Sequence, residues 1–198
     1  LGGVHLQGAG RESTIIFADT GAGSEQKTAI IHAGSWFTPR VGKDNLLMGV
    51  SDLWIKSSHP RPSHVSSATP RPGQDGMHPN IGGILLNTEL GDNPPEPDGA
   101  HRIENVLIWD TAFGVAVLGL DDQGCQLRNI RVRRTLGPGV VIGKSPDHLA
   151  SVTAGRREIG AADNILDAVD VSGANIAGGT SAGFEIYATN TTLTSCKS

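Results

Sequence analysis

The sequence predicts an all-β fold, a right-handed parallel β-helix with long inserted loops. Three observations predict it. A six-residue phrase occurs five times, a second strand-like phrase follows four of its copies, and glycine supplies 27 of the 198 residues while charged residues supply only 18%. Repetition at fixed phase indicates short units that stack and bury a shared core. The low-charge, turn-dense composition is unlike that of a helical protein.

The first phrase alternates apolar and other residues. It reads apolar, polar, small or Asn/Asp, apolar, variable, apolar, and only Ser198 breaks the pattern in the last copy. Period-two alternation rich in Val and Ile predicts strands. The copies start 53, 24, 39 and 27 residues apart, so the spacing of 24 predicts a bare coil and the others predict inserted loops. The copies are VSDLWI from Val50, IENVLI from Ile103, LRNIRV from Leu127, LDAVDV from Leu166 and LTSCKS from Leu193.

The second phrase predicts another strand in each coil. It begins with glycine, where the chain must turn, and continues with alternating apolar residues. A leucine-rich repeat would need a regular Leu-rich consensus and usually a helical segment, and no window shows convincing 3.6-residue periodicity. We therefore favour the parallel β-helix. The copies are GGILLN from Gly82, GVAVLG from Gly114, GVVIG from Gly139 and GFEIY from Gly183.

Alternation also predicts which side chains form the core. In the first phrase we expect an inward stack of Leu53, Ile55, Val106, Ile108, Ile130, Val132, Val169 and Val171. In the second phrase we expect inward columns of Ile84, Ala116, Val140 and Phe184, and of Leu86, Leu118, Ile142 and Ile186. The outward column is then Leu85, Val117, Val141 and Glu185. An apolar outward column predicts that a loop of the same chain or a neighbouring subunit covers it.

We expect residues 1–198 to form one domain that is part of a longer chain, because the sequence lacks an initial Met and stops inside a repeat. Loop insertions are predicted at about 56–82, 87–101 and 143–165, and loops of this length on a rigid scaffold are usually functional or mobile. The first contains His59, His64 and His78, but spacings of 5 and 14 residues fit no zinc motif. We therefore predict no metal site and no cofactor.

Charge and hydropathy exclude some functions. A net charge of −4 argues against nucleic-acid binding, which needs a basic stripe. We expect no membrane insertion, because no apolar run is long enough to span a bilayer and no signal-peptide pattern occurs. Cys125 and Cys196 are expected to be buried, reduced thiols.

The outward side chains of the first phrase form the candidate site. We predict that Trp54, Trp109, Arg131 and Asp170 share one exposed face and bind carbohydrate, since an indole ring stacks on a sugar while charged groups bind hydroxyls or carboxylates. The alternative is a ladder of aromatic and ionic contacts without a ligand. One outward column is Trp54, Leu107, Arg131, Asp170 and Lys197, and the next is Lys56, Trp109, Arg133 and Ser172.

The N-terminal segment GVHLQGAGRESTIIF supplies a family resemblance. Its GAGRES is a weak match to a nucleotide-binding loop, because the third glycine is absent and STIIF predicts a strand where that motif has a helix. Its LxGxGxxxTxI pattern (Leu6, Gly8, Gly10, Thr14 and Ile16) resembles the opening coils of pectin-lyase-like β-helices. That family includes pectate lyases, polysaccharide epimerases and hydrolases, and bacteriophage tailspikes. The resemblance implies the fold but does not choose among these activities.

We expect a bacteriophage virion tail protein, similar to tailspikes or minor tail proteins, that contacts host-surface polysaccharide as a homotrimer beside other tail proteins. The alternative is a secreted polysaccharide lyase, glycoside hydrolase or epimerase, and a structural spacer without a ligand is a third possibility. No catalytic signature occurs, so the catalytic residues of such an enzyme are unknown. The nearest carboxylates are Asp110, Asp121, Asp122 and Asp170, and the nearest bases or cations are Arg131, Arg133 and His101.

Overall fold

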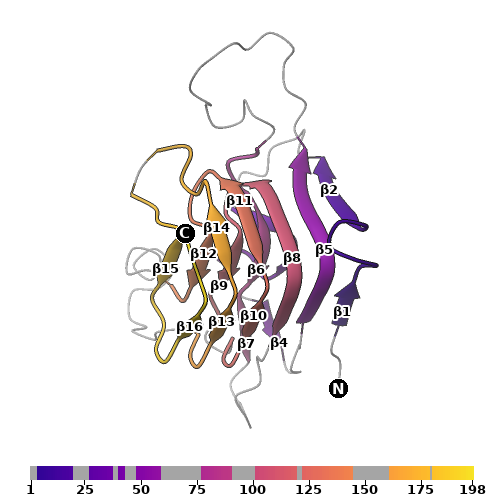
Figure 1. Cartoon of the computed structure of the whole chain (residues 1–198). Coiled ribbons are helices and arrows are strands. Elements are labelled where there is room, and N and C mark those ends of the chain that lie inside the picture. Colours follow the sequence, from indigo (N-terminus) through magenta and orange to yellow (C-terminus); the bar gives the residue numbers. More distant parts are fainter. Residues whose placement is uncertain are drawn as a thin grey trace.

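The computed structural model of the chain is an all-β protein (Figure 1). It describes residues 4–19, 27–37, 40–42, 48–58, 77–90, 101–119, 122–144, 161–178 and 180–198. None of these residues forms a helix, so the described part of the chain contains no helix that could cross a membrane.

The strands of the described residues form three sheets. The nine-stranded sheet contains β1 (Val4–Gln7), β2 (Ile15–Asp19), β5 (Met48–Ser58), β8 (Arg102–Thr111), β10 (Gln126–Arg128), β11 (Arg131–Thr135), β13 (Ile165–Asp167), β14 (Asp170–Ser172) and β16 (Thr192–Thr194). The five-stranded sheet contains β3 (Thr28–Ala33), β6 (Ile81–Leu86), β9 (Val115–Val117), β12 (Val140–Ile142) and β15 (Phe184–Ile186). The third sheet pairs β4 (Arg40–Gly42) with β7 (Thr88–Leu90).

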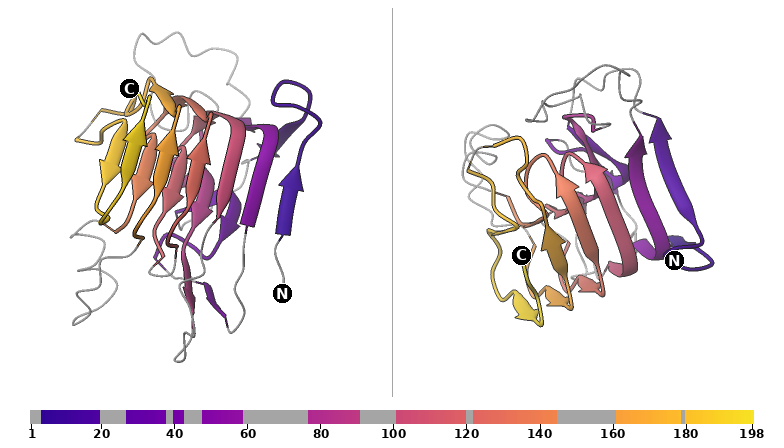
Figure 2. Two further views of the ribbon diagram at one scale, coloured as in Figure 1. Left: turned by 60° about the horizontal axis from the view of Figure 1, so that its bottom comes forward. Right: turned by 45° about the horizontal axis from the view of Figure 1, so that its top comes forward.

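The chain travels alternately through the nine-stranded and the five-stranded sheet. We call one such excursion a pass. Each strand pairs in parallel with its counterpart from the pass before, so β5 pairs with β8 and β6 pairs with β9. The left view of Figure 2 shows the strands of successive passes side by side in sequence order. The predicted all-β class and the parallel pairing are therefore present in the structure.

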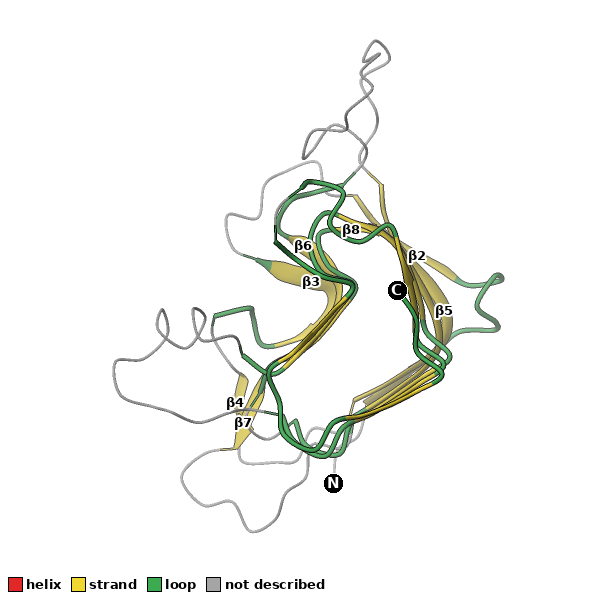
Figure 3. Ribbon diagram, turned by 60° about the vertical axis from the view of Figure 1, so that its left-hand side comes forward, coloured by secondary structure: helices red, strands yellow, loops and turns green. Residues whose placement is uncertain are grey.

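The nine-stranded sheet bends sharply along one line (Figure 3). The residue at the bend of each pass has a positive φ, between 49° and 58°, and is the third residue of the first phrase: Asp52, Asn105, Asn129, Ala168 and Ser195. Asn and Asp tolerate this left-handed conformation better than most residues. Their side chains also bond between passes, with Asn105 Nδ2 2.7 Å from Asp52 Oδ1 and Asn129 Nδ2 3.1 Å from Asn105 Oδ1. The "small or Asn/Asp" position is therefore the bend.

The hydrophobic core lies between the two large sheets. The eight residues predicted as the inward stack of the first phrase are all buried in this core, which confirms that prediction. They come from β5, β8, β11 and β14 and from the residues directly before β11 and β14. From the five-stranded sheet, Ile84, Val115 and Val140 pack against them. Each strand thus contributes every second side chain to the core.

The predicted phase of β9 was wrong by one residue. Val117, expected to point outward, lies in the core, whereas Ala116 and Leu118, expected inward, lie in a second cluster outside it. The register pairs Ile84 with Val115, which aligns Gly114 with Gly83 rather than with Gly82. At three of the aligned glycines, Gly83, Gly114 and Gly139, a methyl group would lie within 2.7 Å of a side chain of the first sheet, that of Ile108, Val132 or Val171.

A second hydrophobic cluster covers the outer surface of the five-stranded sheet. Phe113 is buried in this cluster, and its ring centroid lies 4.8 Å from that of Trp36. Described residues of the same chain therefore bury the outward column, so this column no longer argues for a subunit contact. The homotrimer remains a prediction. The buried members of the cluster are Ala29, Leu85, Ala112, Phe113, Ala116, Leu118 and Val141.

The predicted insertions lie between strands but overlap their ends. β5 continues to Ser58 and β6 begins at Ile81, so both ends of segment 56–82 are strand. Segment 87–101 contains β7, which pairs with β4. Segment 143–165 runs from the end of β12 to the first residue of β13. Residues 59–76, 91–100 and 145–160 lie outside the described residues.

Candidate functional site

The candidate site lies on the outer surface of the nine-stranded sheet, on the side of the bend formed by β2, β11, β14 and the second halves of β5 and β8. Leu53 and Ile55 enter the core, so the residues that alternate with them point away from it. We call this surface the ladder face. It comprises Ile15, Phe17, Trp54, Lys56, Leu107, Trp109, Asp110, Arg131, Arg133, Arg134, Asp170, Ser172 and Lys197.

Strand register aligns these side chains in two columns. Ile15, Trp54, Leu107, Arg131, Asp170 and Lys197 follow one another in the first column. Phe17, Lys56, Trp109, Arg133 and Ser172 follow one another in the second. The early passes therefore present apolar and aromatic groups, and the later passes present charged groups. Both columns predicted from the sequence are confirmed and begin one pass earlier, at β2.

The two tryptophans contact each other directly. Their ring centroids are 5.4 Å apart and their planes are inclined by 27°, which is a stacked arrangement. The Lys56 ammonium lies 5.7 Å from the Trp54 centroid and 5.6 Å from the Trp109 centroid, within cation–π range. Neither buried indole N–H has a hydrogen-bond partner among the described residues. Ring stacking and the nearby ammonium thus hold the pair in place.

Asp170 is the anionic centre of the later passes. Arg133 Nη2 lies 2.7 Å from Asp170 Oδ2, and Lys197 Nζ lies 3.5 Å from the same oxygen. The hydrogen bond from Arg133 holds the pKa of the Asp170 carboxyl below its usual value, and the charges of Arg133 and Lys197 act in the same direction. Asp170 is therefore an ionised acceptor at neutral pH.

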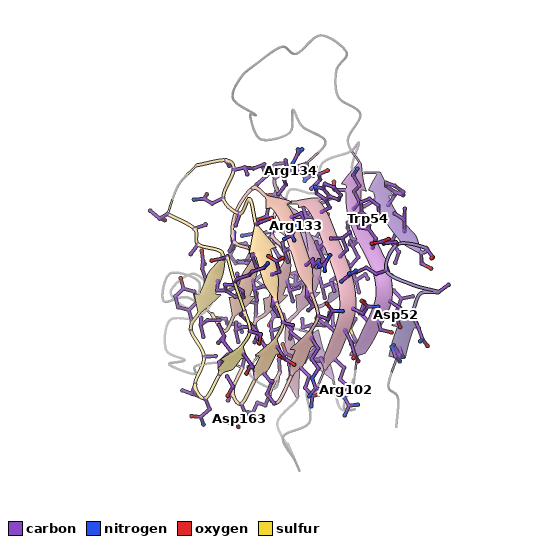
Figure 4. The ribbon with its side chains drawn as sticks, in the orientation of Figure 1. Asp52, Trp54, Arg102, Arg133, Arg134 and Asp163 are labelled. Carbon is purple, nitrogen blue, oxygen red and sulfur yellow. The ribbon has the colours of Figure 1, made fainter. Side chains whose placement is uncertain are left out.

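A second ion cluster lies at the end of the tryptophan pair. Asp110 Oδ1 is 3.0 Å from Arg134 Nε, and Asp110 Oδ2 is 3.9 Å from Lys56 Nζ. Asp110 and Arg134 both have positive φ, 58° and 54°, and occupy the same place in successive passes. Figure 4 shows Arg134 and Arg133 near the same end of the sheet as Trp54, with Arg102 near the opposite end.

The four predicted site residues share this face but do not form one contact set. Trp54 stacks on Trp109, whereas Arg131 makes no ion pair with Asp170 although the two are register partners. Asp170 pairs instead with Arg133, which lies diagonally across the strand pair. The guanidinium of the exposed Arg131 makes no hydrogen bond or ion pair with the described residues.

Sequence reasoning missed Phe17, Ile15 and the pairing of Arg134 with Asp110. Ile15 lies nine residues after Leu6, whereas Trp54 lies only four residues after Val50, so the first pass does not display the phrase. The extra residues form the turn between β1 and β2. STIIF predicts a strand, but Ile15, Ile16 and Phe17 are all apolar, so no alternation in this segment could have placed Phe17 on the outer surface.

The same turn is the GAGRES segment, and it is not built for phosphate. A phosphate-binding loop needs free backbone N–H groups before a helix. Here the N–H groups of Gly8 and Gly10 donate to Ser51 and Asp52, and that of Ala9 donates to Thr14 Oγ1. A strand, β2, follows the turn.

His101 and Asp122, two of the predicted catalytic candidates, lie elsewhere and are fully buried. His101 Nε2 lies 3.0 Å from Asp122 Oδ1, and the Met48 N–H donates to His101 Nδ1 over 3.0 Å. Nδ1 is thus the acceptor, and Nε2 carries the proton donated to Asp122. Asp122 also accepts from Thr88 Oγ1 and from the Gly119 N–H. Both side chains therefore make hydrogen bonds inside the protein, away from the ladder face.

The remaining candidate groups have local partners or lie outside the described residues. Cys125 is a buried and Cys196 a partly buried reduced thiol, and burial raises the pKa of the Cys125 thiol above its ordinary value. His78 Nδ1 accepts a hydrogen bond from the Asn80 N–H. His59, His64 and Asp121 lie outside the described residues.

Comparison of the chain with protein-family models, with curated proteins and with solved structures gives no significant match.

Proposed function

We propose that the ladder face binds an extended carbohydrate. The observation that carries the proposal is the stacked Trp54–Trp109 pair, partly exposed on the same surface as the ion-paired Arg133 and Asp170. An indole ring offers a large apolar surface to the C–H face of a sugar, and charged side chains bind its hydroxyls. Because the two kinds of group lie in neighbouring strands, a polymer that crosses the strands contacts both.

The wider proposal concerns the fold of the chain and the particle to which it belongs. The chain is a right-handed parallel β-helix that resembles pectin-lyase-like proteins, and it serves as a bacteriophage tail component that contacts host-surface polysaccharide as a trimer. Parallel pairing of successive passes and the bare 24-residue pass from Ile103 to Leu127 support the fold. Capsid and tail genes beside its gene would support the assignment to a bacteriophage tail.

The state of Asp170 argues against this carboxyl as the acid of a glycoside hydrolase. Glycoside hydrolysis needs one carboxyl that is protonated near neutral pH, which requires a raised pKa. The pKa of Asp170 is lowered by Arg133, so this carboxyl is a poor proton donor. The enzyme alternative would gain support if incubation with a polysaccharide released unsaturated or reducing ends.

Removal of one indole tests the proposal. We expect Trp109→Ala to weaken retention in affinity electrophoresis through gels of bacterial surface polysaccharides by about tenfold, the equivalent of about 1.4 kcal/mol. Phe37→Ala is the matched control, because Phe37 is an exposed aromatic residue outside the ladder face, and its retention should match the wild type. Circular dichroism should show that both variants fold.

A second substitution keeps the test decisive if Trp109→Ala fails to fold. Phe17 is 55% exposed and aligned with Lys56 and Trp109, so Phe17→Ala removes apolar surface from the face at little cost to the core. We expect weaker retention for this variant too. If a folded Trp109→Ala protein and Phe17→Ala are both retained like the wild type, the ladder face is not the carbohydrate site.

A further inference from the structure

The ladder face carries positive charge on a chain whose net charge is −4. Its described side chains include five cationic groups, Lys56, Arg131, Arg133, Arg134 and Lys197, against two carboxylates, Asp110 and Asp170. Five minus two leaves a local net charge of +3. A local field of this sign attracts an anionic ligand even though the whole molecule is acidic.

The pairing of these charges isolates one residue. Arg133 and Lys197 both pair with Asp170, and Lys56 and Arg134 both lie within ion-pair distance of Asp110. Arg131 lies beside Asp170 in register, but the Asp170 carboxylate contacts Arg133 and Lys197. Among the cations of the ladder face, the Arg131 guanidinium is thus the one that has no hydrogen bond or ion pair with the described residues.

The position of Arg131 relates it to the aromatic pair. Trp54, Trp109 and Arg131 stand on the successive strands β5, β8 and β11, and neighbouring strands lie about 4.8 Å apart. Leu107 lies between Trp54 and Arg131 in the same column. A polymer that runs across the strands from Trp54 over Leu107 therefore meets Arg131 next, one strand before Asp170.

Resting on the proposed carbohydrate function, we infer that the ligand is an anionic polysaccharide and that Arg131 is the residue that selects it. The guanidinium binds a carboxylate or sulfate of one sugar, while a neighbouring sugar lies against the Trp54–Trp109 pair. The planar fork of an arginine matches the two oxygens of a carboxylate, which a lysine in the same place cannot do. The preferred ligand therefore alternates an acidic with an uncharged unit.

The same observations disfavour a nucleic acid. A nucleic acid presents one phosphate per nucleotide, and proteins that bind it neutralise many phosphates at once with a basic stripe. The ladder face offers one guanidinium without a carboxylate partner, and its other four cations share two carboxylates. A polymer with fewer charges and more apolar surface fits this arrangement better.

The experiment compares hyaluronan, which alternates an acidic and a neutral sugar, with its carboxyl-reduced form and with dextran. We expect the wild-type protein to be retained at least about fivefold more strongly by hyaluronan than by the carboxyl-reduced polymer. Arg131→Gln should remove this difference, because retention by hyaluronan should fall further than retention by the neutral polymers, and Arg131→Lys should restore only part of it. Arg128→Gln is the matched control, an exposed arginine beyond the bend, in β10.

The outcomes separate the two proposals. Preferential retention that Arg131→Gln abolishes and Arg128→Gln preserves supports the inference. Equal retention of hyaluronan and its reduced form, or a preference that survives Arg131→Gln, overturns the inference and leaves the carbohydrate function standing. Failure of all three polymers and of the bacterial polysaccharides to bind defeats both. Tighter binding of a single-stranded DNA oligonucleotide than of hyaluronan assigns the face to nucleic acid instead.

Discussion

The amine of Lys27 lies among apolar side chains at the edge of the second hydrophobic cluster, on the outer surface of the five-stranded sheet. Its Nζ lies 3.6 Å from the Trp36 ring centroid and 5.4 Å from that of Phe113. Burial lowers the pKa of Lys27 to about 8, although the charge of Glu185 opposes the shift. The cation–π contacts favour the ammonium, so desolvation is the larger effect.

This pKa makes stability depend on pH. The ordinary pKa is 10.5 and the folded value about 8, so between these values the unfolded chain holds one more proton than the folded chain. The free energy of unfolding should therefore rise with pH across this window, by about 2 kcal/mol. Urea unfolding at pH 7.5 and pH 10 measures the rise.

Lys27→Met is the matched control, because it keeps the length of the side chain and removes the titrating group. Any other group that titrates in this range is present in both proteins. The difference between wild type and variant isolates Lys27. An equal change in both proteins over this range would contradict the assignment.

Which residues face outward could be predicted, but their partners could not. Alternation placed Trp54, Arg131 and Asp170 correctly, because side chains in a strand change face at every residue. Register then made Arg131 and Asp170 neighbours, yet Arg133 holds the carboxylate. An arginine side chain is long enough to reach diagonal neighbours, and its torsions are not encoded in strand periodicity.

The aligned glycines Gly83, Gly114 and Gly139 let the two large sheets approach each other closely. A methyl group at Gly139 would lie 2.3 Å from Val171 Cγ1 and 2.8 Å from the Gly183 carbonyl oxygen. We expect Gly139→Ala to lower the free energy of unfolding by about 2–3 kcal/mol, because the core side chain and the next pass must both move. Chemical denaturation measures the loss.

Gly137 provides the comparison, since a methyl group there would meet no atom closer than 3.3 Å. Gly137→Ala should therefore change stability by less than about 1 kcal/mol. Equal effects at the two positions would mean that loss of backbone freedom, rather than crowding between the sheets, explains the glycines.

At the scale of elements, alternation succeeded where only one face is apolar. β11 and β14 place charged side chains outside and valine inside, which fixes their phase. β9 is buried on both faces, so its sequence Val-Ala-Val fits either phase. The doubled glycine of GGILLN then shifted the alignment by one residue. Phe113 and Trp36 cover the outer face of β9, which is why both of its faces are buried. The repeated phrases do not include these two residues, so the sequence pattern could not predict this cover.

Across the whole molecule, the core side chains are buried in the middle passes and partly exposed in the first and last passes. The inward column Leu6, Val50, Ile103, Leu127, Leu166, Leu193 is buried in its four central members, but Leu6 is 41% and Leu193 45% exposed. β1 and β16 each pair with one strand, whereas β8 is paired on both sides. The terminal passes therefore have the smallest contact free energy.

Hydrogen exchange should reveal this gradient. We expect amides of β8, β10 and β11 to exchange slowest and those of β1 and β16 to exchange orders of magnitude faster, because terminal passes open without global unfolding. Native-state exchange followed by NMR measures the rates. Uniform protection from β1 to β16 would show instead that all passes unfold as one unit.

The variable spacing of the phrases has a consequence for how such a gene can change. From Val50 to Leu193 the phrase recurs after 53, 24, 39 and 27 residues, yet every copy keeps the same strand register. Insertions and deletions between strands thus leave Trp109 beside Lys56 and Arg133. One residue inserted within β8 would turn Trp109 into the core. The gene can therefore acquire and discard loops freely while the composition of the ladder face evolves separately, one point mutation at a time.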